Sequence, residues 1–200
     1  MDYSAKLTGE PFLYPETKII AEYILKGFEV STLKKKNIEE NLIQYKSKSA
    51  IVRVNSAIFR RLSVLNDEML ELFTKDDIPT SKIILLYAIM KTDKLVNDFI
   101  YEVYREKIMM MKDYIETYDI INWFDFKFSN SPNLCKVSES TKYKLKQVLL
   151  KIMVDSGLLI KEKQNYKIIA PLYNEKINNL LSSVGDEEFY KSIGGFLWKQ

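Results

Sequence analysis

Apolar residues recur at three- and four-residue steps along most of this 200-residue chain, and this helical spacing constrains its fold more than any other feature. The pattern is clearest in a segment that Ser47 or Ser49 can cap. Its apolar stripe consists of Ile51, Val54, Ile58, Leu62 and Leu65. This spacing turns Lys48, Arg53 and Arg60 outward. The sequence therefore predicts a mainly α fold.

Other helices are expected where a capping residue or proline begins an apolar stripe. In the first half of the chain they run from Pro15 to Gly27, from Ser31 to about Leu42, and onward from Asn66-Asp67-Glu68. We expect Thr74 to Pro79 to form a loop and Thr80 to cap an apolar helix over Ile83 to Met90.

The middle of the chain continues the helical pattern. Thr92 or Asp93 is expected to cap the next helix. Two further helices are predicted over Lys112 to Tyr118 and about Asp119 to Phe128.

The C-terminal third has a different character. Ser138-Glu139-Ser140-Thr141 opens a long helix that Gly157 ends, and its expected buried face is Leu145, Val148, Leu149, Ile152 and Met153. Two β-prone runs follow, separated by Gln164-Asn165, and predict a hairpin. Asn174 and Asp186 can each cap a later helix. A short helix, a long helix and a hairpin, in this order, are typical of a winged helix-turn-helix.

Basic residues gather in two blocks. Residues 31–61 hold eight Lys or Arg against two acidic residues, a net charge of +6. Residues 138–169 hold seven lysines against three acidic residues, a net charge of +4. The segment between, residues 62–91, has a net charge of −2. Two separate basic blocks favour contact with a polyanion, although solvated lysine faces give the same pattern.

The residue types present argue against several function classes. The chain has no histidine, so it lacks the usual general base and the commonest metal ligand. Cys135 is the single cysteine and is predicted to be a small buried residue. The six glycines form neither a phosphate-binding loop nor a dinucleotide fingerprint. The longest apolar run, Ile83 to Met90, is far shorter than the roughly twenty residues that span a bilayer. We therefore expect no enzyme, no cofactor, no metal, no small-molecule substrate and no membrane partner, and a cytoplasmic location.

The outer face of the long C-terminal helix carries side chains suited to nucleic acid. Lysine can bind phosphate or guanine, glutamine can bind adenine, and serine can bind phosphate. The candidate contacts in this half are Ser138, Ser140, Thr141, Lys144, Gln147, Lys151, Lys161, Lys163 and Lys167, and Arg53 and Arg60 are a second candidate set. Winged modules also pair proteins, so the pattern alone leaves a protein-interaction role open.

Several segments resemble the BrxA family of BREX (bacteriophage exclusion) defence systems. They are Tyr3-Ser4-Ala5-Lys6-Leu7-Thr8, Glu16 after Pro15, Glu40-Asn41-Leu42 with Gln44, and Leu95 with Asp98-Phe99. The most specific one is Ser138-x-Ser140-Thr141-x-x-Lys144-Leu145-x-Gln147-Val148-Leu149, followed by Gly157-Leu158. One position departs from the family pattern, because Val137 stands where relatives tend to have tryptophan.

The resemblance implies a helical bundle similar to NusB, expected over residues 1–92, joined to a winged-helix domain with C-terminal helices over residues 93–200. It also implies double-stranded DNA binding without catalysis, beside other BREX proteins. Relatives are often labelled inner-membrane proteins, and the hydropathy of this chain argues against that label. Two alternatives stay open: an adaptor that docks larger defence subunits, and RNA binding by the NusB-like half.

Overall fold

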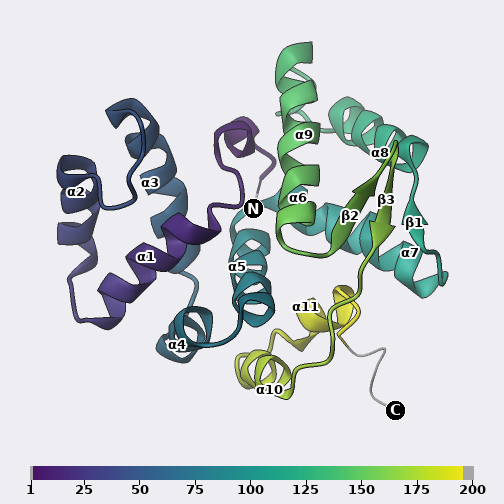
Figure 1. The fold of residues 1–200 in the computed structure, drawn as a ribbon. Helices are drawn as coiled ribbons and strands as arrows, with labels where there is room; N and C mark the ends of the chain where they lie inside the picture. The colour runs from purple at the N-terminus through teal and green to yellow at the C-terminus, as the bar shows by residue number, and fades with distance from the viewer. Residues whose placement is uncertain (1, 196–200) are drawn as a thin grey trace. The chain divides into compact units, whose positions relative to one another are not determined.

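The computed structural model describes residues 2–195 and shows a mainly helical chain with a small three-stranded sheet (Figure 1). The chain divides into two compact units. The first unit comprises residues 9–92, and the second comprises residues 1–8 together with residues 93–200. The first eight residues therefore belong with the C-terminal part of the chain.

The first unit consists of helices α1 (Tyr14–Leu25), α2 (Val30–Glu40), α3 (Lys48–Leu62), α4 (Asp67–Lys75) and α5 (Ile78–Thr92). Side chains cap α2, α3 and α4, where Glu29, Ser47 and Asn66 each accept a hydrogen bond from a first-turn N–H, and α5 is capped in the same way. The predicted stripe of α3 is confirmed, since all five of its apolar residues are buried.

Helix α5 is the centre of this unit. Every residue from Ile83 to Met90 is at most 5% exposed, so the helix is apolar on all sides and α3 and α4 pack against it. It begins at Ile78, which makes the predicted loop from Thr74 to Pro79 wrong. Asp77 provides the cap in place of Thr80, because its Oδ1 accepts from the N–H of Thr80 at 2.7 Å. Proline is tolerated at position 79 because first-turn N–H groups have no partner within the helix.

The second unit begins with a continuous helical stretch made of α6 (Lys94–Phe99), the π-helical turn η2 (Ile100–Tyr104) and α7 (Arg105–Met109). Asp93 caps α6 by accepting from the N–H groups of Leu95 and Val96. Then follow β1 (Tyr114–Ile115), α8 (Thr117–Asn130), α9 (Glu139–Asp155), β2 (Leu159–Glu162), β3 (Asn165–Ile168), α10 (Glu175–Ser183) and α11 (Glu187–Ser192). The predicted helix over Lys112 to Tyr118 is wrong. Met111 adopts a positive φ of 54°, which ends the helical path, and the next residues are extended as β1.

The sheet is antiparallel, with β3 in the middle and β1 and β2 on either side. The hairpin prediction is confirmed, but its turn lies one residue earlier than expected. Glu162 pairs with Asn165, so the turn consists of Lys163 and Gln164. Lys163 has a φ of 54°, in the left-handed region that a non-glycine residue seldom adopts.

Tyr3 attaches the N-terminal residues to the second unit. Its hydroxyl donates to Asp98 of α6 and accepts from Lys127 Nζ of α8 at 3.0 Å. Lys127 is 8% exposed and also donates to Glu102 at 2.7 Å. Burial alone would lower the pKa of Lys127, but the hydrogen bonds to Glu102 and Tyr3 raise it. Asn133, in the loop before α9, donates to the carbonyl oxygen of Tyr3 at 3.3 Å. Tyr3 thus joins α6, α8 and the loop that leads into α9.

Candidate nucleic-acid interface

The beginning of α9 is built by the Ser-x-Ser-Thr motif. Ser138 Oγ accepts from the Thr141 N–H at 3.3 Å and lies 3.0 Å from the hydroxyls of both Ser140 and Thr141. Ser138 is therefore the helix cap, as its position predicts. Ser138 and Ser140 are exposed and Thr141 is half-buried. These hydroxyls surround the N-terminus of α9, where helix N–H groups favour an anion.

Helix α9 has the buried face and the exposed face that the sequence predicts. The residues Leu145, Val148, Leu149, Ile152 and Met153 are all buried. The opposite face exposes Ser140, Lys144, Gln147 and Lys151. Steps of four, three and four residues place these four side chains on one line along the helix. The structure therefore brings four of the five α9 candidates together on a single exposed face, and the fifth, Thr141, is half-buried beside Ser138.

Ion pairs distinguish the lysines of α9 from one another. Lys142 pairs with Glu139 at 2.7 Å, Lys146 with Asp125 at 3.3 Å, and Lys151 with Asp155 at 3.0 Å. Lys144 is exposed and makes no ion pair or hydrogen bond with another described residue. Lys144 therefore carries a positive charge with no acidic partner. Lys151, by contrast, would have to break its ion pair with Asp155 before it could neutralise a phosphate. That exchange costs little, because both partners are near the surface.

The hairpin lysines point in different directions. Lys167 lies opposite Ile160 of β2 and Tyr114 of β1, and all three side chains are exposed. Lys161 lies opposite Tyr166, whose other partner, Ile115, is fully buried. Because side chains alternate along a strand, Lys161 and Lys167 project from opposite faces of the sheet. Lys163 is at the turn, and none of the three lysines forms an ion pair within the described residues. The sequence analysis listed these lysines as one set of contacts. A flat binding surface, however, cannot contact both faces of the sheet.

The hairpin turn is fixed to the beginning of α8. Thr117 Oγ1 donates to the carbonyl oxygen of Gln164, and the Thr117 N–H donates to Asn165 Oδ1 at 3.3 Å. Hydrogen bonds to Thr117 thus hold both residues of this predicted turn against the beginning of α8.

The second candidate set, Arg53 and Arg60, lies on α3 of the other unit. Arg53 is exposed, and its side chain lies over Gly9. Arg60 is not turned freely outward as predicted. It pairs with Glu10, whose side chain is only 7% exposed. The sequence analysis did not predict that Arg60 pairs with Glu10, because the two residues are far apart in the sequence.

Arg61, next to this pair, has a structural role that the sequence analysis did not assign. Arg61 is 1% exposed, and its guanidinium donates to the carbonyl oxygens of Glu10, Pro11 and Phe12. Its position three residues after Ile58, on the apolar stripe, indicates this burial.

The prediction that Cys135 is buried is wrong. It lies in a turn whose N–H groups return to Ser131, and Leu134 occupies the buried position of that turn. Cys135 therefore points to solvent.

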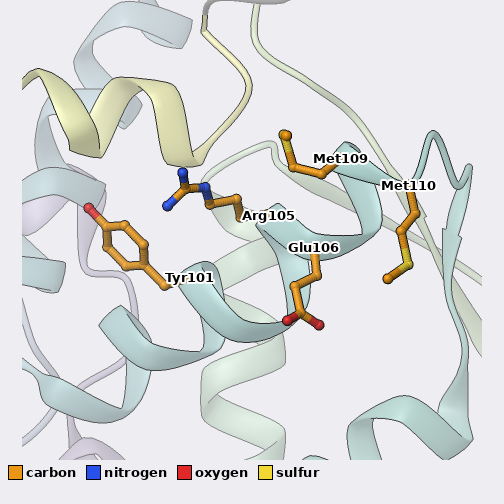
Figure 2. Close-up of a pocket in the computed structure, with 5 residues that line it drawn as sticks. All are labelled: Tyr101, Arg105, Glu106, Met109 and Met110. Atoms are coloured by element: carbon orange, nitrogen blue, oxygen red, sulfur yellow. The ribbon is translucent and has the colours of Figure 1, made fainter.

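A shallow hollow of about 360 Å³ lies along η2 and α7, lined by Tyr101, Arg105, Glu106, Met109 and Met110 (Figure 2). Met109 and Met110 are more than half exposed, and Glu106 points away from Arg105. These side chains do not converge on a common point, so we assign no ligand to this hollow.

Residues 2–195 form neither a metal-binding cluster nor a membrane-spanning helix. In this range no three or more His, Cys, Asp and Glu side chains gather as a metal site would require. None of the helices described is both long enough and apolar enough to cross a bilayer.

The family model of BrxA matches residues 1–185 of the chain. The chain belongs to the BrxA family. It is 33% identical to the BREX protein BrxA of Bacillus cereus (strain H3081.97) over 92% of each chain. It is 25% identical to the BREX protein BrxA of Escherichia coli O9:H4 (strain HS), over 76% of this chain and 71% of that protein. The resemblance stated from the sequence is thereby confirmed.

The fold is also similar to a solved structure. An uncharacterized protein from Magnetospirillum magneticum superposes with a TM-score of 0.81, at 20% identity, over 96% of this chain and 98% of that one. At this identity the likeness concerns the fold alone.

Proposed function

We propose that this BrxA-family chain binds double-stranded DNA through α9 and the β2–β3 hairpin, as a non-enzymatic, cytoplasmic component of a BREX phage-defence system. The observation that carries the proposal is the exposed line Ser140, Lys144, Gln147 and Lys151 on α9, with the uncompensated charge of Lys144 near its centre. A line that combines phosphate-binding and base-reading side chains is suited to a helix in the major groove.

The arrangement of elements in the second unit supports this proposal. Helix α9 follows α8 across a short loop, the hairpin follows α9, and β1 pairs with β3 beside it. This is the order of a winged helix-turn-helix, in which the last helix enters the major groove and the wing contacts the backbone. We interpret residues 93–200, together with residues 1–8, as this domain with its C-terminal helices, and residues 9–92 as a NusB-like bundle.

The test is binding of purified protein to a duplex over a salt series. Affinity should fall as salt rises, with a log-log slope of about −0.9 per phosphate contact, because bound lysines release condensed counterions. The double variant Lys144→Ala and Lys151→Ala should make this slope less negative by the equivalent of about two phosphate contacts. Lys191→Ala on α11, which also removes one charge, is the matched control and should leave the slope unchanged. Unchanged affinity and slope in a folded Lys144/Lys151 variant would disprove a DNA-reading role for α9.

Two alternatives predict other outcomes. An adaptor that docks another BREX protein predicts no duplex binding and a partner affinity that salt hardly changes. RNA binding by residues 9–92 predicts that structured RNA competes better than duplex DNA and that the α9 substitutions have no effect.

A further inference from the structure

A groove of about 460 Å³ lies between α2 and α3 of the first unit, which pack against each other (Figure 1). It is lined by Lys34 and Ile38 of α2 and by Val52, Asn55, Ser56, Phe59, Arg60 and Ser63. Ile38 and Val52 are its accessible apolar side chains, and Lys34 Nζ lies 5.5 Å from the centre of the buried Phe59 ring at its base. Val52 is 50% exposed and lies on the face of α3 opposite its buried stripe.

Hydrogen bonds between α2 and α3 fix the shape of the groove. Asn55 is 6% exposed and donates to the carbonyl oxygen of Lys34 at 3.0 Å. Its Oδ1 accepts from the side chain of Asn37 at 2.9 Å. Because both bonds join α3 to α2, the groove is preformed and a ligand need not order it.

The rim of the groove is positive. No carboxylate is among the described residues that line it. Arg60 is already neutralised by Glu10, so the net charge of the lining comes from Lys34. Lys48 does not line the groove, but it adds a second positive charge one helical turn before Val52. Within the described chain neither lysine forms an ion pair. The groove therefore has an apolar centre between uncompensated cations.

The dimensions fit a helix. From Val52 to Ser63 the groove follows α3 for eleven residues, which corresponds to about 16 Å or three turns. A helix that packs into such a groove presents apolar residues at i, i+3 or i+4, and i+7. Single-stranded nucleic acid fits less well, because it requires exposed aromatic rings and Phe59 is only 4% exposed.

We propose that the α2–α3 groove binds an acidic amphipathic helix of a partner protein, with its apolar stripe on Ile38 and Val52 and its acidic flanks on Lys34 and Lys48. This second binding surface is separate from α9 and the hairpin. The protein would then hold a partner with one unit while the other unit binds DNA.

The test uses the full chain and a synthetic capped peptide of about three turns, with leucines at i, i+4 and i+7 and glutamates on both flanks. Fluorescence anisotropy should show saturable binding, and the same peptide with lysines for glutamates should bind at least about tenfold more weakly. Val52→Glu should weaken binding of the glutamate peptide by a similar factor without unfolding, because the site is half exposed. Val30→Glu on α2 is the control, since Val30 is also exposed but does not line the groove.

Duplex DNA affinity should be the same in Val52→Glu and in the parent chain, which separates this proposal from the function of α9. Lys34→Glu provides a second variant should Val52→Glu fail to fold. Equal binding of the two peptides, or binding that neither groove variant changes, would overturn the proposal. Displacement of the glutamate peptide by a single-stranded oligonucleotide would reassign the groove to nucleic acid.

Discussion

Arg60 donates from both terminal nitrogens to the two carboxylate oxygens of Glu10, across fifty residues of sequence. The side chain of Glu10 is 7% exposed and that of Arg60 is 32% exposed. A carboxylate this deeply buried needs its partner, because an unpaired charge in the interior is costly. The pair fixes the segment before α1 against α3.

The first prediction concerns this pair. Arg60→Ala should lower the free energy of unfolding by about 1–3 kcal/mol, because it leaves Glu10 buried without its cation. Arg53→Ala, an exposed arginine on the same helix, should change it by less than about 0.5 kcal/mol. Urea unfolding followed by circular dichroism measures both. Equal effects would show that the pair does not stabilise the unit, and a large Arg60 effect makes Arg60 unsuitable as a DNA-binding probe.

The second prediction is a pH dependence at Asp98. Burial raises the pKa of Asp98, but hydrogen bonds from Tyr3, Lys94 and Asn97 outweigh it and lower the pKa below its ordinary value. The ionised carboxylate thus stabilises the fold above the unfolded pKa of about 3.9, and this contribution is lost as the pH falls through the lower folded pKa.

Urea midpoints measured between about pH 6 and pH 3 should therefore fall more steeply for the parent chain than for Asp98→Asn. Asp113→Asn, which changes an exposed acid of the same unit, should follow the parent curve. Parallel curves for Asp98→Asn and the parent would contradict the lowered pKa.

The third prediction separates stability from binding at Lys163. Its φ of 54° suits glycine, so Lys163→Gly should raise the free energy of unfolding by up to about 1 kcal/mol. The same change removes a cation from the hairpin turn and, under the proposed function, should flatten the salt slope of duplex binding by about 0.9. Lys163→Ala removes the charge without relieving the backbone and should weaken binding without added stability. Destabilisation by glycine would contradict the strain at this turn.

The fourth prediction follows from the opposite directions of Lys161 and Lys167. A duplex that meets one face of the hairpin should engage only one of them. Lys161→Ala and Lys167→Ala should therefore change the salt slope unequally, and the double variant should match the larger single effect. Equal and additive effects, measured by the same titration, would mean that the duplex wraps around the hairpin.

Local patterns in the sequence predicted most of the helix starts and the buried faces. Ser47, Asn66, Asp93, Ser138 and Asn174 cap the helices that they were expected to cap. A capping side chain accepts a hydrogen bond from an N–H group within three residues of it, so both partners lie in the same short segment of sequence.

Several of the features that were missed depend on partners far away in the chain. Strand β1 has two residues and exists because β3, about fifty residues later, pairs with it. Tyr3 meets Lys127, and Arg60 meets Glu10, across similar or greater separations. The outer face of α9 could be predicted because it is the complement of a periodic buried face. The ion pair between Lys146 and Asp125 could not be predicted, since Asp125 lies on another helix.

The last prediction concerns base reading by Gln147. Its side chain is exposed on the α9 line, one turn beyond Lys144, and carries both an amide donor and an acceptor that can match adenine. Gln147→Ala removes no charge, so the salt slope should stay the same while the preference among duplex sequences changes. Competition binding against a pool of randomised duplexes, read by sequencing, would show loss of selectivity at one position, worth about 1–3 kcal/mol if both hydrogen bonds reach the base. Lys144→Ala in the same assay should weaken all sequences nearly equally. If Gln147→Ala leaves the selected sequences unchanged while Lys144→Ala lowers affinity, α9 contacts the phosphate backbone and its glutamine does not read bases.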